Sequence, residues 1–207
     1  MNVIKRVMGY VGTNTYFLEK NGEMLVIDPC LDPNNDASKL FDVIGDHKVV
    51  GVLLTHAHFD HISGVDAICD KYKCPLYMNQ SEIEWLDNPD LNLSYMVPET
   101  VIIKTKPTVL SLGNHQISNF DFEMIETKGH TRGSVSYVFD DKVFDGDFIF
   151  HLSVGRMDLP TGSESDMMQD ISDFIERFAT INPTLYPGHG NTTTLNKEIE
   201  LNPYIRL

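Results

Sequence analysis

The feature that most constrains this chain is an apolar run that ends in a cluster of polar side chains. Residues 49–54 read Val-Val-Gly-Val-Leu-Leu, and residues 55–61 read Thr-His-Ala-His-Phe-Asp-His. A run that is apolar at nearly every position predicts a strand buried on both faces of a sheet. Alternate residues of an extended chain point to the same side, so His56, His58 and Asp60 can converge where the strand ends. The sequence therefore predicts a polar site at one edge of a buried sheet.

The side chains in this segment are those that bind metal ions. His56, His58, Asp60 and His61 fall within six residues, which is too dense for ordinary packing. Imidazole nitrogen with carboxylate oxygen suits a borderline divalent ion, so zinc is favoured, with iron and manganese as alternatives. The competing interpretation is a solvated polar loop with chance histidines. The density of ligand-type residues favours a metal site.

Three later segments offer further candidate ligands, each at the end of a strand-like run. They are His130 within Gly129–Gly133, Asp147 after Phe144, and His189 after Pro187. The glycines around His130 permit a tight turn that exposes the imidazole. A single Gly-His pair is more often a turn than a ligand. Together with the dense first segment, however, these residues form a consistent set at strand ends.

Strand-like and helix-like segments alternate along the whole chain, which predicts a mixed α/β (α+β) layered domain. The clearest helix is 166–179, where apolar residues recur at helical spacing and Ser163 with Asp166 offers a capping box. A second helix is expected over 62–72, and a loop over 88–98. The expected strands are 3–8, 15–19, 24–27, 47–55, 108–112, 120–126, 134–139, 142–144 and 183–186.

Composition excludes several classes of protein. The 207 residues include 30 acidic and 16 basic side chains, for a net charge of −14. Binding nucleic acid needs a basic face, and an anionic membrane repels an acidic protein, so neither partner is expected. Runs of 18 apolar residues are absent, which argues against a membrane-spanning helix. Three cysteines make no disulfide framework, and the N-terminus lacks a signal-peptide core, so we expect a cytoplasmic protein.

With these residues in view, the sequence resembles the metallo-β-lactamase fold superfamily, and within it the short glyoxalase II-like (hydroxyacylglutathione hydrolase-like) hydrolases. The most specific match is His-x-His-x-Asp-His at 56–61, and the resemblance extends from Asn14 to about Pro203. It implies a four-layer αβ/βα sandwich, formed as a single domain over 1–207, with the ligands along one edge. Glyoxalase II carries a further helical region after its last ligand, but only 18 residues follow His189 here, so the likeness is to the short members. Gly190 and Arg132 stand where the family often has Glu and Pro.

The resemblance also implies a role for each candidate residue. His56, His58 and His130 would bind a first divalent ion, while Asp60, His61 and His189 would bind a second. Asp147 would bridge the two ions. Asp28 would orient a ligand, as ligating histidines usually require; its other interpretation is an Asp that opens a turn before Pro29. The implied cofactors are therefore two divalent metal ions, with zinc favoured.

The reaction implied by the resemblance is hydrolysis of a small thioester or related acyl compound by a metal-bound hydroxide. Such a glyoxalase II-like thioesterase acts on a small molecule, and Asp60 would have a catalytic role by accepting a hydrogen bond from the attacking water. Arg156 falls nine residues after Asp147. It is a candidate for contacting an anionic substrate group, and the alternative is that it ties down a loop.

Two other functions stay open on sequence alone. Persulfide dioxygenases resemble the same scaffold and use a single iron ion, so an oxidoreductase is the main rival. A non-catalytic, metal-stabilised binding protein is the second, because a fold does not fix a function. One iron per chain with oxygen uptake would indicate the dioxygenase. Two zinc-like ions with thioester cleavage would indicate the hydrolase.

Overall fold

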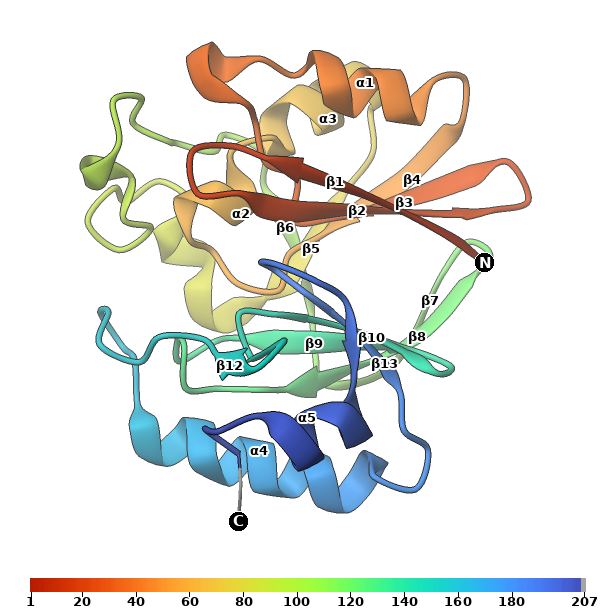
Figure 1. The fold of residues 1–207 in the computed structure, drawn as a ribbon. Helices are drawn as coiled ribbons and strands as arrows, with labels where there is room; N and C mark the ends of the chain where they lie inside the picture. The colour runs from red at the N-terminus through yellow and green to blue at the C-terminus, as the bar shows by residue number, and fades with distance from the viewer. Residues whose placement is uncertain (206–207) are drawn as a thin grey trace. The chain divides into compact units, whose positions relative to one another are not determined.

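The computed structural model describes residues 1–205 and divides into two compact units (Figure 1). The first unit comprises Met1–Ser111 and Gln116–Asp121. The second comprises Leu112–His115 and the chain from Phe122 onward. Each unit contains a six-stranded sheet with helices on one face, so the mixed α/β class predicted from the sequence is confirmed.

The sheet of the first unit has the strand order β1–β2–β3–β4–β5–β6. Antiparallel pairing joins β1 to β2 and β2 to β3, whereas β3, β4, β5 and β6 pair in parallel. Parallel neighbours need crossover connections, and helices supply two of them. The strands are β1 (Asn2–Met8), β2 (Thr13–Lys20), β3 (Glu23–Ile27), β4 (Lys48–Leu53), β5 (Leu76–Asn79) and β6 (Pro107–Leu110). The helices are α1 (Ser38–Ile44), α2 (Phe59–Ile62), α3 (Val65–Tyr72), and the short 3-10 helices η1 (Pro33–Asn35), η2 (Gln80–Trp85) and η3 (Ser94–Met96).

Helices α1 and α3 cover one face of this sheet (Figure 1). Leu40 of α1 and Ile68 of α3 belong to the same core cluster as Val26 and Val52, which come from neighbouring strands. The alternate strand residues, such as Leu53, are buried as well. Strand β4 is therefore buried on both faces, as its nearly continuous apolar run predicts.

The second unit has the sheet order β14–β13–β10–β9–β8–β7 and a separate hairpin of β11 and β12. Strands β10 and β13 are parallel, while β8 pairs with β9, β9 with β10, and β13 with β14 in antiparallel fashion. Helices α4 and α5 lie on one face (Figure 1). The strands are β7 (Gly113–Ile117), β8 (Phe120–Glu126), β9 (Val135–Phe139), β10 (Lys142–Gly146), β11 (Ile149–Phe150), β12 (Ser153–Val154), β13 (Thr184–Pro187) and β14 (Thr193–Thr194). The helices are α4 (Glu164–Phe178) and α5 (Leu195–Leu201).

Helix α4 begins and packs as its sequence predicts. The Ser163 hydroxyl accepts a hydrogen bond from the Asp166 backbone N–H at 3.2 Å, which caps the first turn. Met167 and Ile171 are buried in the core of the unit, together with Phe174. The predicted helix over 166–179 is therefore confirmed, with its start two residues earlier at Glu164.

The helix expected over 62–72 is confirmed as α3, Val65–Tyr72, but it starts three residues later, and Ile62 ends a separate short helix, α2 (Phe59–Ile62). The break falls at Gly64, whose backbone N–H donates to the Pro29 carbonyl at 2.8 Å. A Cβ at Gly64 would lie 2.9 Å from that carbonyl oxygen, so only glycine permits the approach. A contact with a residue 35 positions earlier thus ends one helix and begins the next.

Two further expectations can be compared with the described residues. The three cysteines are free thiols, in keeping with the absence of a disulfide framework. Among residues 1–205, every helix falls short of the length and hydrophobicity that crossing a bilayer requires.

Candidate metal centre

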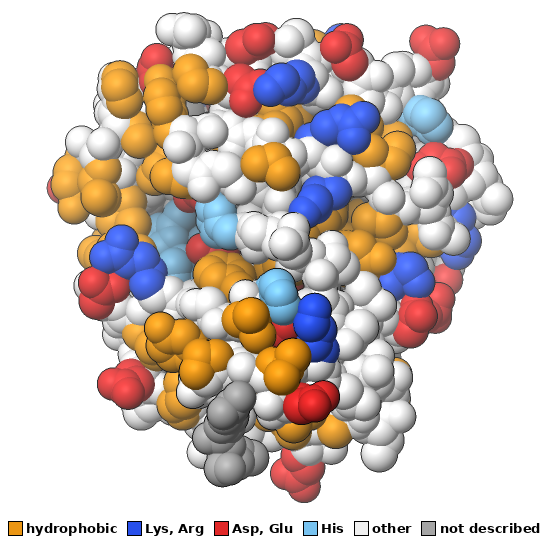
Figure 2. Space-filling model, viewed as in Figure 1, with side chains coloured by type: hydrophobic (Ala, Val, Ile, Leu, Met, Phe, Trp, Pro, Cys, Tyr) orange, Lys and Arg blue, Asp and Glu red, His pale blue; other side chains and the backbone are white. Residues whose placement is uncertain are grey.

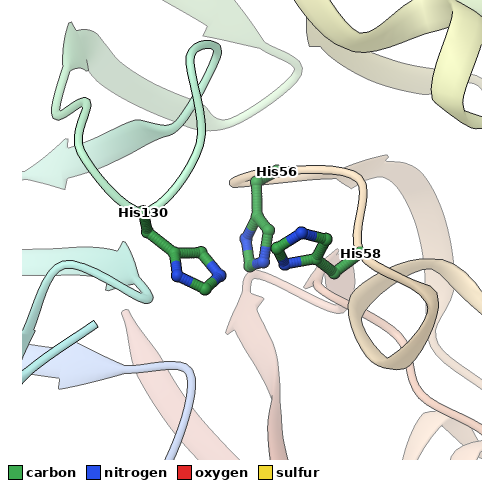
Figure 3. A group of neighbouring side chains, drawn as sticks. All are labelled: His56, His58 and His130. Atoms are coloured by element: carbon green, nitrogen blue, oxygen red, sulfur yellow. The ribbon is translucent and has the colours of Figure 1, made fainter. Parts of the chain in front are cut away.

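The first unit supplies four of the seven predicted ligands, His56 and His58 from the connection between β4 and α2, and Asp60 and His61 from α2 itself. His56, His58, Asp60 and His61 are all buried. The ring centroid of His56 is 4.8 Å from that of His58 and 4.0 Å from that of His61. In Figure 3, His56 and His58 come from this connection. The extended chain before α2 carries His56 and His58, as the alternation predicts, whereas Asp60, expected on the same extended run, lies in α2 together with His61.

Asp28 holds this connection in place from the end of the neighbouring strand β3. Its carboxylate accepts hydrogen bonds from the Thr55 backbone N–H at 2.8 Å and from the Thr55 hydroxyl at 2.6 Å. It also lies 2.9 Å from Nδ1 of His61. Because an ionised carboxylate only accepts hydrogen bonds, Nδ1 of His61 carries the proton and Nε2 is the atom that can bind a metal ion.

Asp60 is oriented by a residue that the sequence did not single out. The Thr13 hydroxyl, at the start of β2, donates to Oδ2 of Asp60 at 2.6 Å, and both residues are buried. The same carboxylate oxygen is 3.3 Å from Nε2 of His61. Thr13 was missed because it is 47 residues away from Asp60 in sequence.

The second unit supplies the other three predicted ligands from the ends of three strands. His130 lies between β8 and β9, and Figure 3 shows it on that loop. Asp147 follows β10 directly, and His189 follows β13. Oδ2 of Asp147 lies 3.4 Å from Nε2 of His130 and 3.5 Å from Nε2 of His189. One carboxylate oxygen is therefore close to an imidazole nitrogen on each of two strand-end loops.

These separations fit the spacing of ligands around a metal ion. Two atoms that each lie about 2.0–2.1 Å from one tetrahedral zinc ion are about 3.3–3.4 Å apart. The nitrogen–oxygen separations of 3.3 Å for His61 with Asp60, 3.4 Å for His130 with Asp147, and 3.5 Å for His189 with Asp147 match this value. The donor atoms and their spacing thus suit a divalent cation.

The His130 ring is held in the same manner as that of His61. Its Nδ1 lies 2.8 Å from the backbone carbonyl of Arg156, which can only accept a hydrogen bond, so Nδ1 carries a proton and Nε2, which faces Asp147, is the nitrogen that can bind a metal ion. The neighbouring Gly155 has no room for a side chain, since a Cβ there would lie 1.9 Å from the Asp147 carbonyl oxygen and 3.3 Å from Cβ of His130. Glycine at 155 lets the two loops approach closely.

Arg156 itself makes contacts with its own loop. Its exposed guanidinium forms two hydrogen bonds with the Asp158 carboxylate, at 2.8 and 2.9 Å, and this pair holds the pKa of Asp158 at about 2. Both groups are exposed to solvent, so the pair adds little to stability. The backbone of Arg156 supports His130, while its side chain pairs with Asp158.

Another histidine and two aromatic side chains lie outside the ligand set. His151 donates through Nδ1 to the buried carboxylate of Glu198 at 2.9 Å. Trp85 is buried, with its ring centroid 5.7 Å from that of His58, whereas Tyr95 is 62% exposed. Among the described residues, the side chains that could take part in holding a metal ion are the seven predicted ones: His56, His58, Asp60, His61, His130, Asp147 and His189.

Comparison with known proteins identifies the family. A model of the metallo-beta-lactamase superfamily matches residues 8–189, which include all seven candidate ligands. A "Probable metallo-hydrolase" of Streptococcus pyogenes is 34% identical over 213 aligned positions, covering 99% of this chain and 90% of that protein. Both comparisons extend over the two units described above.

Solved structures agree with the family match. A B3 metallo-beta-lactamase, BLEG-1, superposes with a TM-score of 0.89 and 30% identity, covering 100% of both chains. TTHA1623, solved in a di-iron-bound form, superposes with a TM-score of 0.82 and 27% identity, covering 98% of this chain and 100% of the other. The metallo-β-lactamase fold predicted from the sequence is therefore confirmed.

Proposed function

This chain belongs to the metallo-β-lactamase superfamily, and from that membership we propose that it is a hydrolase that binds two divalent metal ions and cleaves a small thioester or related acyl compound. The observation that carries the proposal is the position of Asp147, one of whose oxygens lies 3.4 Å from His130 and 3.5 Å from His189. A carboxylate so placed suits the role of a bridge between two ions. The di-iron form of TTHA1623 supports dinuclear binding.

In this proposal, the ligands divide between two ions. His56, His58 and His130 would hold one ion, Asp60, His61 and His189 would hold the other, and Asp147 would be a ligand of both. Zinc is favoured by the mixture of imidazole and carboxylate donors, and iron is the alternative that the same donors accept. The protonated Nδ1 atoms of His61 and His130 support this division, because each fixes Nε2 as the donor atom.

Residues of this chain orient the reacting groups. A divalent cation, when bound, polarises a carbonyl group and lowers the pKa of a bound water to about 7. Asp60, held by the Thr13 hydroxyl, accepts a hydrogen bond from the attacking water and so orients it. Water adds to the carbonyl carbon of the thioester, the carbon–sulfur bond breaks, and the products are a carboxylic acid and a thiol. No nucleophilic serine or cysteine is needed for this reaction.

A second candidate substrate is a β-lactam. The B3 metallo-beta-lactamase BLEG-1 is 30% identical and matches this chain along its full length. A β-lactam is a strained cyclic amide. In its hydrolysis Asp60 and the cations would have the same roles as in the hydrolysis of a thioester. The leaving group is an amine in the β-lactam and a thiol in the thioester.

The test combines elemental analysis with a substrate panel. The purified protein is analysed for zinc, iron and manganese per chain, and then assayed on S-acyl thiols, lactones, a chromogenic β-lactam and persulfides. We expect two ions per chain and turnover on at least one S-acyl thiol. His58→Ala and Asp147→Ala should lose metal and activity, whereas His47→Ala, at the turn between α1 and β4, should retain both.

Other results would contradict the proposal in distinct ways. One iron per chain with oxygen consumption on persulfides would indicate the dioxygenase. Bound metal without turnover on any member of the panel would indicate a metal-stabilised binding protein. Unchanged metal content in both His58→Ala and Asp147→Ala would refute the proposed ligand set.

A further inference from the structure

A buried carboxylate outside the ligand set contacts the segment that carries His56 and His58. Glu82 lies in η2 and is 1% exposed. Its Oε2 accepts a hydrogen bond from the backbone N–H of Ala57 at 2.7 Å. Ala57 stands between the two histidines, and all three residues are buried. The backbone that places both imidazoles is therefore fixed by a side chain 25 residues further along the chain.

The same 3-10 helix makes a second contact with this segment. The ring centroid of Trp85 is 5.7 Å from that of His58, and Trp85 is fully buried. Glu82 thus holds the backbone before His58, and Trp85 packs against its ring. These two contacts fix the backbone between the histidines and restrict the rotation of the His58 imidazole, and such support of a ligand strengthens metal binding.

The charge of Glu82 calls for an explanation beyond the hydrogen bond. Burying an ionised carboxylate costs free energy unless nearby positive charge offsets it. A neutral glutamine could accept the same hydrogen bond from Ala57 through its amide oxygen. A buried carboxylate in contact with this segment places negative charge beside the two histidines.

Bound cations would provide the offsetting charge. Two divalent ions bring four positive charges, and the carboxylates of Asp60 and Asp147 neutralise two of them. Asp28 and Glu82 are the buried carboxylates that contact the His56–His61 segment from outside the ligand set, through Thr55, His61 and Ala57. Their negative charges add to the attraction of this segment for a cation.

We propose that Glu82 is a positioning residue that fixes the His56–His58 segment and supplies negative charge that strengthens cation binding by this unit. The inference rests on the proposed function, since it assumes that the histidines bind a cation. It assigns Glu82 no contact with the substrate or with the reacting atoms. Substitution of Glu82 should therefore change cation affinity more than it changes the fold.

The experiment compares two variants of Glu82 with a matched control. Glu82→Gln keeps the acceptor for Ala57 and removes the charge, while Glu82→Ala removes both. Glu84→Gln removes a carboxylate from the same 3-10 helix at an exposed position. Zinc affinity is measured by competition with a chromogenic chelator, and the melting temperature of each metal-free protein is measured separately. The visible spectrum of the cobalt(II)-loaded proteins reports the geometry around the ion.

We expect Glu82→Gln to bind zinc roughly 10- to 100-fold more weakly than the unmodified protein, the range usual for residues that support a metal ligand. Its metal-free melting temperature should stay close to that of the unmodified protein, and Glu84→Gln should match the unmodified protein in all measurements. Glu82→Ala should weaken binding further and alter the cobalt spectrum, because the segment loses its anchor.

Two results would overturn the proposal, and they are distinguishable. If Glu82→Gln binds zinc as tightly as the unmodified protein, the charge has no role in cation binding, and the proposed function stands. If the unmodified protein binds neither zinc nor cobalt, the proposed function fails together with this inference. Should Glu82→Ala fail to fold, the Glu82→Gln measurement alone decides.

Discussion

A hydrogen bond to one ring nitrogen decides which atom of a histidine can bind a metal ion. Nδ1 of His61 donates to Asp28, and Nδ1 of His130 donates to the carbonyl of Arg156. In both residues Nε2 is then the donor atom, and in both it lies within 3.4 Å of a carboxylate oxygen. One carboxylate and one backbone carbonyl thus fix the same tautomer in two separate units.

Replacing Asp28 by asparagine tests this orientation. The amide can still accept one hydrogen bond from Thr55, but it lacks the charge that favours the proton on Nδ1 of His61. We expect Asp28→Asn to lower zinc affinity or kcat/KM by roughly 10- to 100-fold. Both are measured on the purified variant, with the exposed Asp90→Asn as control. An Asp28→Asn protein with unchanged zinc affinity and kcat/KM would show that His61 needs no carboxylate.

Gly155 supports a prediction about close approach. A Cβ at this position would lie 1.9 Å from the Asp147 carbonyl oxygen, so an alanine forces the backbone of one loop to move. We expect Gly155→Ala to destabilise the protein by about 1–3 kcal/mol, the usual cost of overpacking. It should also weaken zinc binding, because the displaced backbone carries Asp147. Urea unfolding and chelator competition measure the two effects. A variant that keeps both the stability and the zinc affinity of the unmodified protein would mean that the loop adapts freely.

The site residues that the sequence predicts lie close together in the chain, whereas those that it does not predict are distant from the segment that they contact. His56, His58, Asp60 and His61 form a local pattern, so their chemistry is readable from adjacent positions. Thr13 and Glu82 act on that segment from 47 and 25 residues away, and neither belongs to a recognisable pattern. A lone threonine in a strand or a glutamate in a short helix is indistinguishable from many others until the fold brings it to its partner.

At the scale of elements, parallel strand pairs explain why the ligands meet at strand ends. In the first sheet β3 and β4 are parallel, so Asp28 after β3 lies beside Thr55 after β4. In the second sheet β10 and β13 are parallel, so Asp147 after β10 lies beside His189 after β13. The carboxyl ends of parallel neighbours share an edge. The sequence predicts the strands, but pairing between strands distant in the chain is set by the whole sheet.

Two short elements, α1 and β5, have no counterpart among the elements expected from the sequence. The seven-residue helix α1 and the four-residue strand β5 have too few positions to establish a periodic pattern. The fifteen-residue helix α4 has enough positions, and it carries its own cap at Ser163. Periodicity therefore identifies long elements, whereas short ones depend on packing that the local sequence does not record.

One buried glutamate connects helix α5 to the rest of its unit by hydrogen bonds. Glu198 accepts hydrogen bonds from Nδ1 of His151, the backbone N–H of Leu152, the Thr193 hydroxyl and the Asn202 amide. Burial opposes ionisation of this carboxyl, but the four hydrogen bonds outweigh it and lower its pKa below the ordinary value of 4.5. The ionised form of Glu198 therefore stabilises the folded state.

The lowered pKa of Glu198 predicts a pH dependence of stability. A carboxyl whose pKa is lower in the folded state contributes stability above its unfolded pKa and loses it as the pH falls. We expect Glu198→Gln to be less stable than the unmodified protein at pH 7, with the difference shrinking below about pH 4.5. Melting temperatures from pH 7 to pH 3 measure this, with the exposed Glu200→Gln as control. A difference that stays constant over this range would contradict the prediction.

At the scale of the whole molecule, the net charge and the ligand set are related. The chain carries a net charge of −14, and several of its buried carboxylates lie at the candidate metal centre. Like charges held together in a folded protein repel one another, which lowers the stability of the compact state. Divalent cations bound at the centre would offset part of this repulsion and should therefore stabilise the protein as a whole.

Removal of metal tests that consequence. Ligands that bind only the folded state stabilise it by mass action, by about 4 kcal/mol when their concentration is 1,000 times Kd. For a chain of this size each kcal/mol changes Tm by about 2–4 °C, so chelation should lower Tm by about 8–16 °C. Differential scanning calorimetry with increasing EDTA, followed by re-addition of zinc, measures the loss and its reversal. His58→Ala should respond much less to EDTA, because it has already lost a ligand. If elemental analysis shows the metal removed while Tm is unchanged, cation binding contributes nothing to the stability of the fold.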